Sequence, residues 1–425
     1  MIIKRIQSVK GMHDYLPEEL NVWNTTESVL KKIFKNYGYC EIRLPILEKT
    51  KLFTRSIGEI TDIIEKEMYT FNDRNKKSLT LRPESTTCCV RAILENNLLK
   101  NIKQRFWYFG PMFRYEKPQK GRYRQFYQFG CEIYGLSNPK IELELILLLN
   151  RIWKILKISN NIYLEINSIG TITARERYKD DLINYLISKK KFLDLDSQNR
   201  LYKNPLRILD SKNKNTQNIL KNAPVLLDYL NENSINNFNF VCNSMKKIGI
   251  PFKINKNLIR GLDYYNDIVF EWKTKIPKLG SQNTICAGGR YDKLIQILGG
   301  PKTPALGCAI GMERLIAIIN AKKNISREII TDIYIISTIL EENVKFIQYI
   351  EKIRKNFFQL SIVEDLNIGS VNKKIIRARK FKPKIILLIN DVLFEKNMIE
   401  IKYFDKKYSK IIPMKDIIFF LKSFF

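Results

Sequence analysis

Residues 105–132, RFWYFGPMFRYEKPQKGRYRQFYQFGCE, concentrate the side chains best suited to chemistry. Aromatic and apolar residues flank a Pro-Gln-Lys-Gly turn, which predicts two strands joined by a basic loop. Guanidinium groups hold phosphate bidentately, aromatic rings stack on bases, and carboxylates accept hydrogen bonds from amines. The stretch therefore suits a phosphorylated nucleotide beside a small polar substrate, although a solvated edge hairpin with a charged rim would give the same pattern. Strand alternation gathers six side chains on one surface: Arg114 and Glu116 from the first strand, and Arg124, Phe126, Gln128 and Glu132 from the second.

Two further segments place reactive groups beside predicted strands. The sequence Arg82-Pro83-Glu84-Ser85-Thr86 follows a predicted hairpin over 66–83 and opens a helix. Its carboxylate and hydroxyl groups could bind an ammonium group, or they could cap the helix. The sequence RGLDYY, residues 260–265, follows a predicted strand over 251–259 and could place positive charge and hydroxyl donors in a pocket.

Residues 307–315, GCAIGMERL, pass from a small-residue strand into an apolar helix. Glycines allow close approach of a ligand, and Arg314 in the first helical turn could clamp terminal phosphates. Residues 286–292, CAGGRYD, come shortly before this segment and form a second Gly-rich, charged peptide.

The elements that must position these groups alternate along the chain. We expect a helix over 21–37, a proline-bearing strand over 41–48, a helix over 140–157 and a strand over 162–166. Residues 170–248 are rich in Lys and Asn and predict a helical module, with helices near 182–193 and 224–230, or else a solvated connector. From residue 332 onward, βα alternation predicts a separate small α/β domain after a linker at 321–327.

Length and composition limit the number of domains, the kind of partner and the kinds of active site that are possible. A chain of 425 residues exceeds one ordinary core and predicts two or three domains. Its net charge of +30 indicates a polyanionic partner, although abundant Ile, Lys and Asn would also follow from an AT-biased coding sequence. The single histidine, His13, excludes a multi-histidine metal site and argues against a histidine-based triad.

Cysteines and apolar runs indicate the compartment. The seven cysteines lack C-x-x-C spacing, which predicts reduced thiols and no metal site. The N-terminus lacks a signal peptide pattern, and no apolar run approaches the ~20 residues that span a bilayer. We therefore expect a cytoplasmic protein without a membrane partner.

These motifs resemble those of one family. FRYEKPQKGRYRQFYQ resembles motif 2 of the class II histidyl-tRNA synthetases, RGLDYY and CAGGRYD resemble their two signature peptides, and GCAIGMERL resembles motif 3. The resemblance implies an α/β (α+β) fold in which residues 1–325 form a catalytic domain around an antiparallel sheet, with a helical insertion at about 170–248. It further implies a C-terminal α/β anticodon-binding domain at 330–425 and a homodimer built partly by motif 1 near 41–48.

The resemblance also implies an activity, histidine–tRNA ligation. L-histidine would be activated by ATP, with Mg²⁺ on the β- and γ-phosphates, and the histidyl group would pass to the 3′ end of tRNA-His. Two alternatives stay open: a non-catalytic paralogue acting as an ATP phosphoribosyltransferase regulatory subunit, and an RNA-binding sensor module. The implied catalytic residues are Arg114 and Arg260. The implied ATP-binding residues are Arg114, Glu116, Arg124, Phe126 and Arg314. The implied histidine-binding residues are Glu84, Ser85 (a glycine in the family), Thr86, Arg114, Gln128, Glu132, Arg260, Tyr264 and Tyr265. The tRNA acceptor end is assigned to Gln119, Lys120, Arg122 and Arg124.

Overall fold

A computed structural model describes residues 5–58, 61, 63–99, 104–119, 121–276, 283–321, 331–339, 343–404 and 408–425. The chain divides into two compact units, Met1–Tyr15 with Val22–Ile325 and Leu16–Asn21 with Ser326–Phe425. Each unit has its own sheet. Over the described ranges, no helix is both long enough and apolar enough to cross a membrane.

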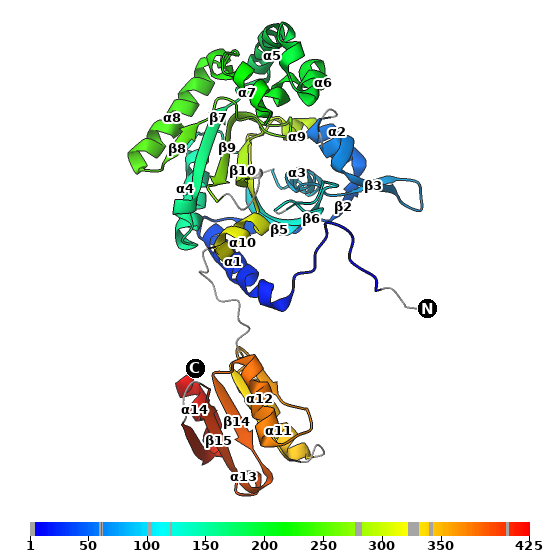
Figure 1. Cartoon of the computed structure of the whole chain (residues 1–425). Coiled ribbons are helices and arrows are strands. Elements are labelled where there is room, and N and C mark those ends of the chain that lie inside the picture. Colours follow the sequence, from blue (N-terminus) through cyan, green and yellow to red (C-terminus); the bar gives the residue numbers. More distant parts are fainter. Residues whose placement is uncertain are drawn as a thin grey trace. The chain divides into compact units, whose positions relative to one another are not determined.

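An eight-stranded sheet forms the centre of the first unit (Figure 1). Its strands, in spatial order, are β1 (Cys40–Glu41), β5 (Gln104–Phe113), β6 (Gln125–Tyr134), β11 (Ala305–Gly311), β10 (Thr284–Arg290), β9 (Asn266–Thr274), β7 (Ile162–Ser168) and β8 (Phe252–Ile254). The two edge pairs are parallel and the pairs between them antiparallel. The predicted hairpin of β5 and β6 is confirmed, and β11 places residue 307 opposite residue 132 and residue 311 opposite residue 128.

Helices cover this sheet and bury its apolar side chains. On β6, Phe129 faces α1 (Pro17–Asn36), where its ring lies 5.1 Å from that of Phe34. Helix α4 (Lys140–Ile155) packs on β9 through Trp153 and Trp272, whose rings are 6.0 Å apart. Because side chains alternate along a strand, the even-numbered residues of β6 face the opposite side, where the candidate site lies.

A second, three-stranded sheet corrects one prediction. The strand expected over 41–48 is wrong as a single element, since β1 joins the large sheet and β2 (Leu47–Lys49) joins β4 (Ser78–Leu81) and β3 (Tyr69–Asn72). Pro45 lies between them and lacks the N–H that a continuous ladder needs. The buried Arg82 guanidinium stabilises the break, donating to the carbonyls of Leu44 and Pro111 at 2.9 Å each. The two helices beside this sheet are α2 (Thr50–Ile57) and α3 (Thr86–Glu95).

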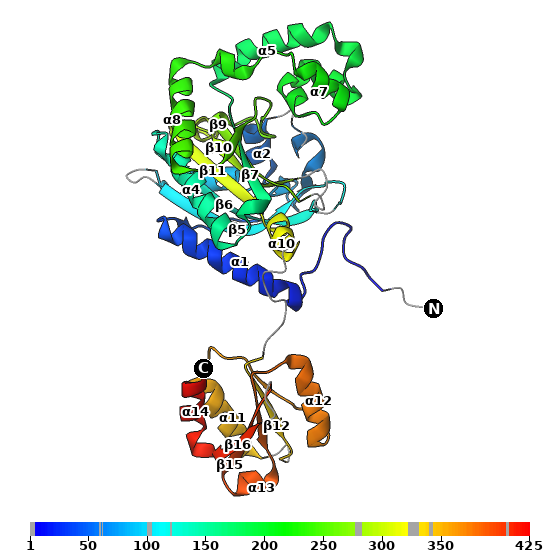
Figure 2. The ribbon, with the colours of Figure 1, turned by 60° about the vertical axis from the view of Figure 1, so that its left-hand side comes forward.

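The lysine-rich central segment is a packed helical module, which excludes the solvated connector. Its helices gather beside one part of the sheet (Figure 2): α5 (Ile172–Ile187), α6 (Leu195–Lys203), α7 (Lys214–Leu220) and α8 (Glu232–Ile248). Their buried leucines, such as Leu182 and Leu201, continue into the same core as Ile259 and Tyr264. The helix expected over 182–193 begins earlier and ends at Ile187, and the one over 224–230 is only a 3₁₀ turn, Leu226–Tyr229, because α8 needs Asn231 as its cap.

The strand predicted over 251–259 ends at Ile254. Asn255 stops it, because its side chain accepts a hydrogen bond from the Asn257 N–H at 3.1 Å and turns the chain. Residues 260–265 consequently lie in a loop, and α9 (Leu294–Ile297) and α10 (Met312–Ala321) complete the unit.

The second unit shows the predicted βα alternation around a five-stranded sheet. Its strands, in spatial order, are β13 (Ile362–Glu364), β12 (Ile333–Ser337), β14 (Ile385–Ile389), β15 (Met398–Tyr403) and β16 (Ser409–Pro413). Its helices are α11 (Val344–Asn356), α12 (Val371–Phe381), α13 (Asp391–Glu395), which sequence reasoning missed, and α14 (Ile417–Phe424). Apart from Ala321, the predicted linker at 321–327 lies outside the described residues.

Candidate active site

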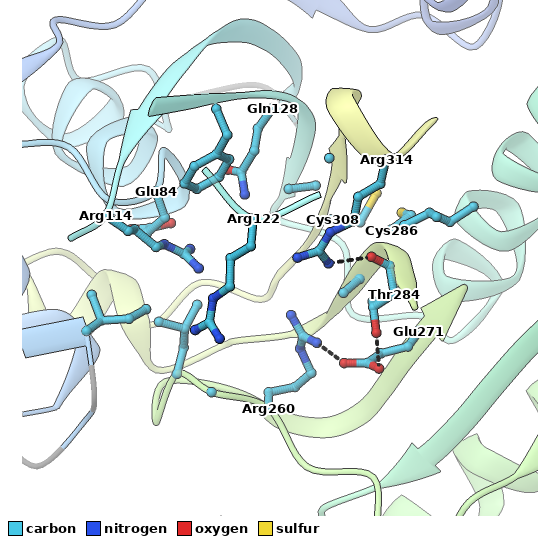
Figure 3. Close-up of a pocket in the computed structure, with 18 of the residues that line it drawn as sticks. Glu84, Arg114, Arg122, Gln128, Arg260, Glu271, Thr284, Cys286, Cys308 and Arg314 are labelled. Atoms are coloured by element: carbon cyan, nitrogen blue, oxygen red, sulfur yellow. Dashed lines mark hydrogen bonds and ion pairs between the residues drawn. The ribbon is translucent and has the colours of Figure 1, made fainter. Parts of the chain in front are cut away.

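A pocket of about 350 Å³ opens over the even-numbered face of β6, between the loop at 114–124 and the loop at 260–265. Arg114 and Arg260 both line it, and Figure 3 shows them entering from different sides. The other predicted site residues that line it are Glu84, Thr86, Glu116, Arg122, Phe126, Gln128, Tyr264, Tyr265 and Arg314. Residues that lie more than 140 positions apart in the sequence therefore share one cavity.

Arg114 leaves the end of β5 and points into the pocket (Figure 3). Its Nε donates to the Pro83 carbonyl at 2.9 Å, and its guanidinium carbon lies 5.2 Å from the centre of the Phe126 ring. Burial lowers the pKa of this guanidinium, which the carboxylates of Glu67 and Glu84 partly offset. A part-buried cation held by a carbonyl and an aromatic face is poised to bind an anion.

Arg260 extends from the loop opposite and forms an ion pair with Glu271 of β9. Its guanidinium carbon lies 5.5 Å from the centre of the Tyr265 ring. Burial works against this charge, but Glu271 and the neighbouring tyrosines raise its pKa above the ordinary arginine value. Its Nε is buried without a hydrogen-bond partner among the described residues, so a donor is available to a ligand.

Arg314 occupies the first turn of α10, as predicted. It donates from Nε to the Gly121 carbonyl at 2.9 Å and from Nη1 to the Thr284 carbonyl at 2.6 Å, the second bond being drawn in Figure 3. Burial, with the nearby charges of Arg114 and Arg122, lowers its pKa to about 10. Five arginine side chains thus line the pocket together with several carboxylates, an arrangement that favours a polyanionic ligand.

Glu84 occupies a position compatible with both roles that the sequence left open, capping a helix and binding an ammonium group. Its carboxylate caps α3, accepting from the N–H groups of Thr86 at 2.7 Å and Thr87 at 2.9 Å, and it also lines the pocket. Ser85 is different, because it is fully buried and its Oγ donates to the Met112 sulfur at 3.4 Å. Ser85, which was expected among the histidine-binding residues, does not line the pocket, because at the N-cap of α3 its side chain turns into the core.

Glu132 also lies elsewhere than expected. Its fully buried carboxylate is absent from the pocket lining and accepts hydrogen bonds from the hydroxyls of Thr86 at 2.7 Å, Tyr108 at 3.1 Å, and Tyr291. Burial raises its pKa to about 8. Gly307 on the adjacent strand leaves room for it, because a Cβ there would overlap its Oε2. Glu132 therefore braces the residues of the pocket wall from behind.

The loop after β5 is divided between the pocket and its outer surface. Arg122 lines the pocket and pairs with Glu116 and Glu67. Arg124 does not line it, because its guanidinium lies 3.8 Å from the centre of the Tyr115 ring and donates to the Glu116 carbonyl at 3.2 Å. Gln119 is likewise absent from the lining, and Lys120 lies outside the described residues.

Sequence reasoning missed several residues of the pocket. Glu313 lines it and accepts hydrogen bonds from the Tyr15 hydroxyl and the Tyr127 N–H, each at 2.7 Å, and burial raises its pKa to about 7. Its position next to Arg314 was the available signal. Glu271 and Arg207 carried no motif, and Arg207 reaches the pocket from the helical module. Within the described part of the chain, no group of three or more His, Cys, Asp or Glu is placed to hold a metal ion.

The fold and the pocket define the catalytic domain of a class II aminoacyl-tRNA synthetase. A solved structure of the apo histidyl-tRNA synthetase from S. aureus matches with a TM-score of 0.82 and 30% identity, covering 98% of this chain and 100% of that one. The family model for histidyl-tRNA synthetase matches residues 11–315.

Two relatives named histidine–tRNA ligase match nearly the whole chain. The protein from Buchnera aphidicola subsp. Schizaphis graminum (strain Sg) is 53% identical over 424 residues, covering 98% of this chain and 99% of the relative. The protein from Buchnera aphidicola subsp. Baizongia pistaciae (strain Bp) is 48% identical over 408 residues, covering 95% of each. The chain belongs to the histidyl-tRNA synthetase family.

Proposed function

We propose that this pocket activates histidine with ATP and then transfers it to tRNA. Membership of the family makes the chain a histidine–tRNA ligase, an enzyme that forms aminoacyl-tRNA and uses ATP. The assignment of residues to steps is our proposal. The observation that carries it is that Arg114 and Arg260 enter one cavity from different sides, beside polar groups suited to an amino acid.

Adenylate formation needs an α-phosphate held in line with the attacking carboxylate of histidine. Positioning and charge stabilisation supply most of the rate in such reactions, with no covalent enzyme intermediate. Arg114 and Arg260 hold the α-phosphate from two sides, and the unpartnered Nε of Arg260 supplies one donor. Arg314, at the start of α10, holds the terminal phosphates.

The adenine base stacks on Phe126 and donates its amino group to Glu116. Both side chains line the pocket, and both are engaged by arginines, since Arg114 lies beside Phe126 and Arg122 pairs with Glu116. Nucleotide binding therefore exchanges an internal ion pair for contacts to the ligand. The cost of losing that pair is small, because Arg122 retains Glu67.

Histidine occupies the end of the pocket beside the tyrosines. Glu84, Thr86 and Gln128 hold its α-amino group. The buried Tyr264 hydroxyl has no hydrogen-bond partner among the described residues, and an imidazole nitrogen would satisfy it. Tyr265 lies next to it, with ring centres 4.7 Å apart. Glu132 acts indirectly, fixing Thr86 and Tyr291 from behind.

The pocket fits a magnesium ion brought in by the nucleotide. Mg²⁺ takes oxygen ligands from phosphates, water and one or two carboxylates, and Glu271 and Glu313 are carboxylates of the lining. When bound, the ion neutralises charge on the β- and γ-phosphates. The chain's own arginines supply the remaining positive charge.

The parts outside the pocket serve tRNA and assembly. We assign the acceptor end to Gln119, Lys120, Arg122 and Arg124, with the helical module beside it, and the anticodon to the unit at 326–425. We place the enzyme in the cytoplasm, because tRNA is used there. A homodimer is supported by the short edge strand β1 and by exposed apolar side chains nearby, including Ile46, Leu47 and Phe71.

One assay tests this function against its alternatives. Histidine-dependent exchange of pyrophosphate into ATP, followed by charging of tRNA-His, is expected of the ligase. Neither a regulatory subunit of ATP phosphoribosyltransferase nor an RNA-binding sensor would support exchange. Exchange that is absent with histidine, or equal with other amino acids, would contradict the proposal.

A further inference from the structure

The loop that carries Tyr264 and Tyr265 leads into β9, and the second residue of that strand, Asp267, has an unusual backbone conformation. Its φ of +49° lies in the left-handed region, which few residues other than Gly, Asn and Asp adopt. Its N–H donates to the Gly170 carbonyl at 3.0 Å, and its carbonyl accepts from the Ile169 N–H at 2.8 Å. These bonds fix Asp267 at the point where β7 leads into the helical module.

The side chain of Asp267 holds the start of the last helix of the same module. Ser234, in the first turn of α8, donates from Oγ to Asp267 Oδ1 at 2.5 Å. Ser234 is itself fixed, because its N–H donates to the Asn231 side chain at 2.8 Å. Asp267 therefore bonds both the segment that enters the module and the start of its last helix, where Ser234 is nearly fully buried.

The same carboxylate is connected to the amino-acid end of the pocket. Asp267 Oδ2 accepts from Asn266 Nδ2 at 2.8 Å, and Asn266 Oδ1 accepts from the Asp292 N–H at 2.7 Å. Asp292 follows Tyr291, whose ring lies 5.6 Å from that of Tyr264 and whose hydroxyl donates to Glu132. Part-buried hydrogen bonds and one ring contact thus connect the helical module to the tyrosines.

We propose that Asp267 is a positioning residue through which the helical module sets the placement of Tyr264 and Tyr265 for the amino acid. This inference rests on the proposed function and deepens it. The pair Ser234–Asp267 touches no ligand, because neither residue lines the pocket. Loss of the Ser234–Asp267 hydrogen bond should therefore weaken histidine binding. ATP binding should not change, because it depends on the arginines and Phe126.

The test uses side chains that the backbone tolerates. Asp267→Gly removes the carboxylate and suits a positive φ, while Ser234→Ala removes only the hydroxyl donor. We expect the histidine KM in pyrophosphate exchange to rise roughly 10-fold in Asp267→Gly and roughly 3- to 5-fold in Ser234→Ala. The ATP KM stays within about twofold in both variants, since no ATP contact is altered.

Three controls separate positioning from general stability. The double variant should match Asp267→Gly, because the hydrogen bond can be lost only once. Asp267→Asn keeps an acceptor for Asn266 and a group that can donate to the Ser234 hydroxyl, so it should restore the histidine KM to near the wild-type value. Ser188→Ala, an exposed serine at the end of α5, should behave as wild type.

Two outcomes would overturn the inference. In the first, the histidine KM is unchanged in Ser234→Ala, even if Asp267→Gly fails to fold. In the second, histidine and ATP KM values rise equally while the melting temperature falls, which would indicate a merely structural role. A wild-type enzyme without histidine-dependent exchange would instead contradict the proposed function.

Discussion

Replacing Glu132 by glutamine removes the most perturbed carboxyl group of the site while keeping its shape. Burial raises the pKa of Glu132 from 4.5 to about 8, so the folded state holds a proton that the unfolded chain releases at lower pH. Between these two values the folded state binds more protons than the unfolded state, and stability therefore falls as pH rises. The contribution of the Glu132 proton to the free energy of unfolding is fully present below pH 4.5 and is lost as the pH rises through 8.

The size of the stability change follows from the pKa shift of Glu132. Each pKa unit corresponds to about 1.4 kcal/mol, so the wild type should lose on the order of 3 kcal/mol between pH 5 and pH 8 from this group. Glu132→Gln lacks the proton and should lose none of it. The difference in unfolding free energy between the two proteins isolates this contribution, since other titrating groups, including Glu313, are common to both.

Tryptophan fluorescence is the appropriate probe, because Trp23, Trp107, Trp153 and Trp272 all lie in the first unit. Urea unfolding at pH 5, 6, 7 and 8 would give the difference at each pH. Glu95→Gln, which alters an exposed carboxylate at the end of α3, is the control and should follow the wild type. The unfolding free energy of the wild type minus that of Glu132→Gln should fall as the pH rises. A difference that stays constant across this range, or that grows with pH, would refute the reasoning.

Three other perturbations test separate parts of the account. Phe126→Ala should raise the ATP KM roughly 10-fold with little change for histidine, because one stacking surface is lost; equal changes for both substrates would contradict this. Gly307→Ala should lower the melting temperature by several degrees and impair exchange, since a Cβ would overlap Glu132; an unchanged melting curve would contradict the packing. In the second unit, Arg379→Ala with Lys380→Ala should lower kcat/KM for tRNA about 10-fold without altering exchange, because exposed charges of α12 are lost. Lys422→Ala, on α14, packed against the other face of that sheet, should have little effect, and equal losses at both sites would contradict a specific RNA-binding face.

Local patterns predicted the elements and the groups they present directly. Strand alternation correctly placed Phe126 and Gln128 on one face of β6, because the period of a strand depends on neighbouring residues alone. The first-turn position of Arg314 was equally readable from the change of a small-residue strand into an apolar helix.

Partners distant in the sequence could not be predicted. Glu132 lies on the same face as Phe126, yet whether it meets a ligand depends on Tyr291, which only the order of β6, β11 and β10 brings beside it. The Tyr15 hydroxyl likewise donates to Glu313, which lies 298 positions later in the sequence. Such contacts follow from sheet order and helix packing, which no local pattern specifies.

Composition was informative only in part. The many lysines of the central segment were compatible with a solvated connector, and the buried leucines between them decided the outcome. The break at Pro45 was signalled by the proline itself, but the carbonyl partners of Arg82 that stabilise it required the structure.

The central claim is that Arg114 and Arg260 act on one phosphate in one cavity. Its most direct test is the single-turnover rate of histidyl-adenylate formation in Arg260→Ala, measured alongside histidine binding by equilibrium dialysis. We expect the rate to fall at least ~1,000-fold, because a charge aimed at the transition state is removed, while histidine still binds. A rate within about tenfold of the wild type would contradict the claim.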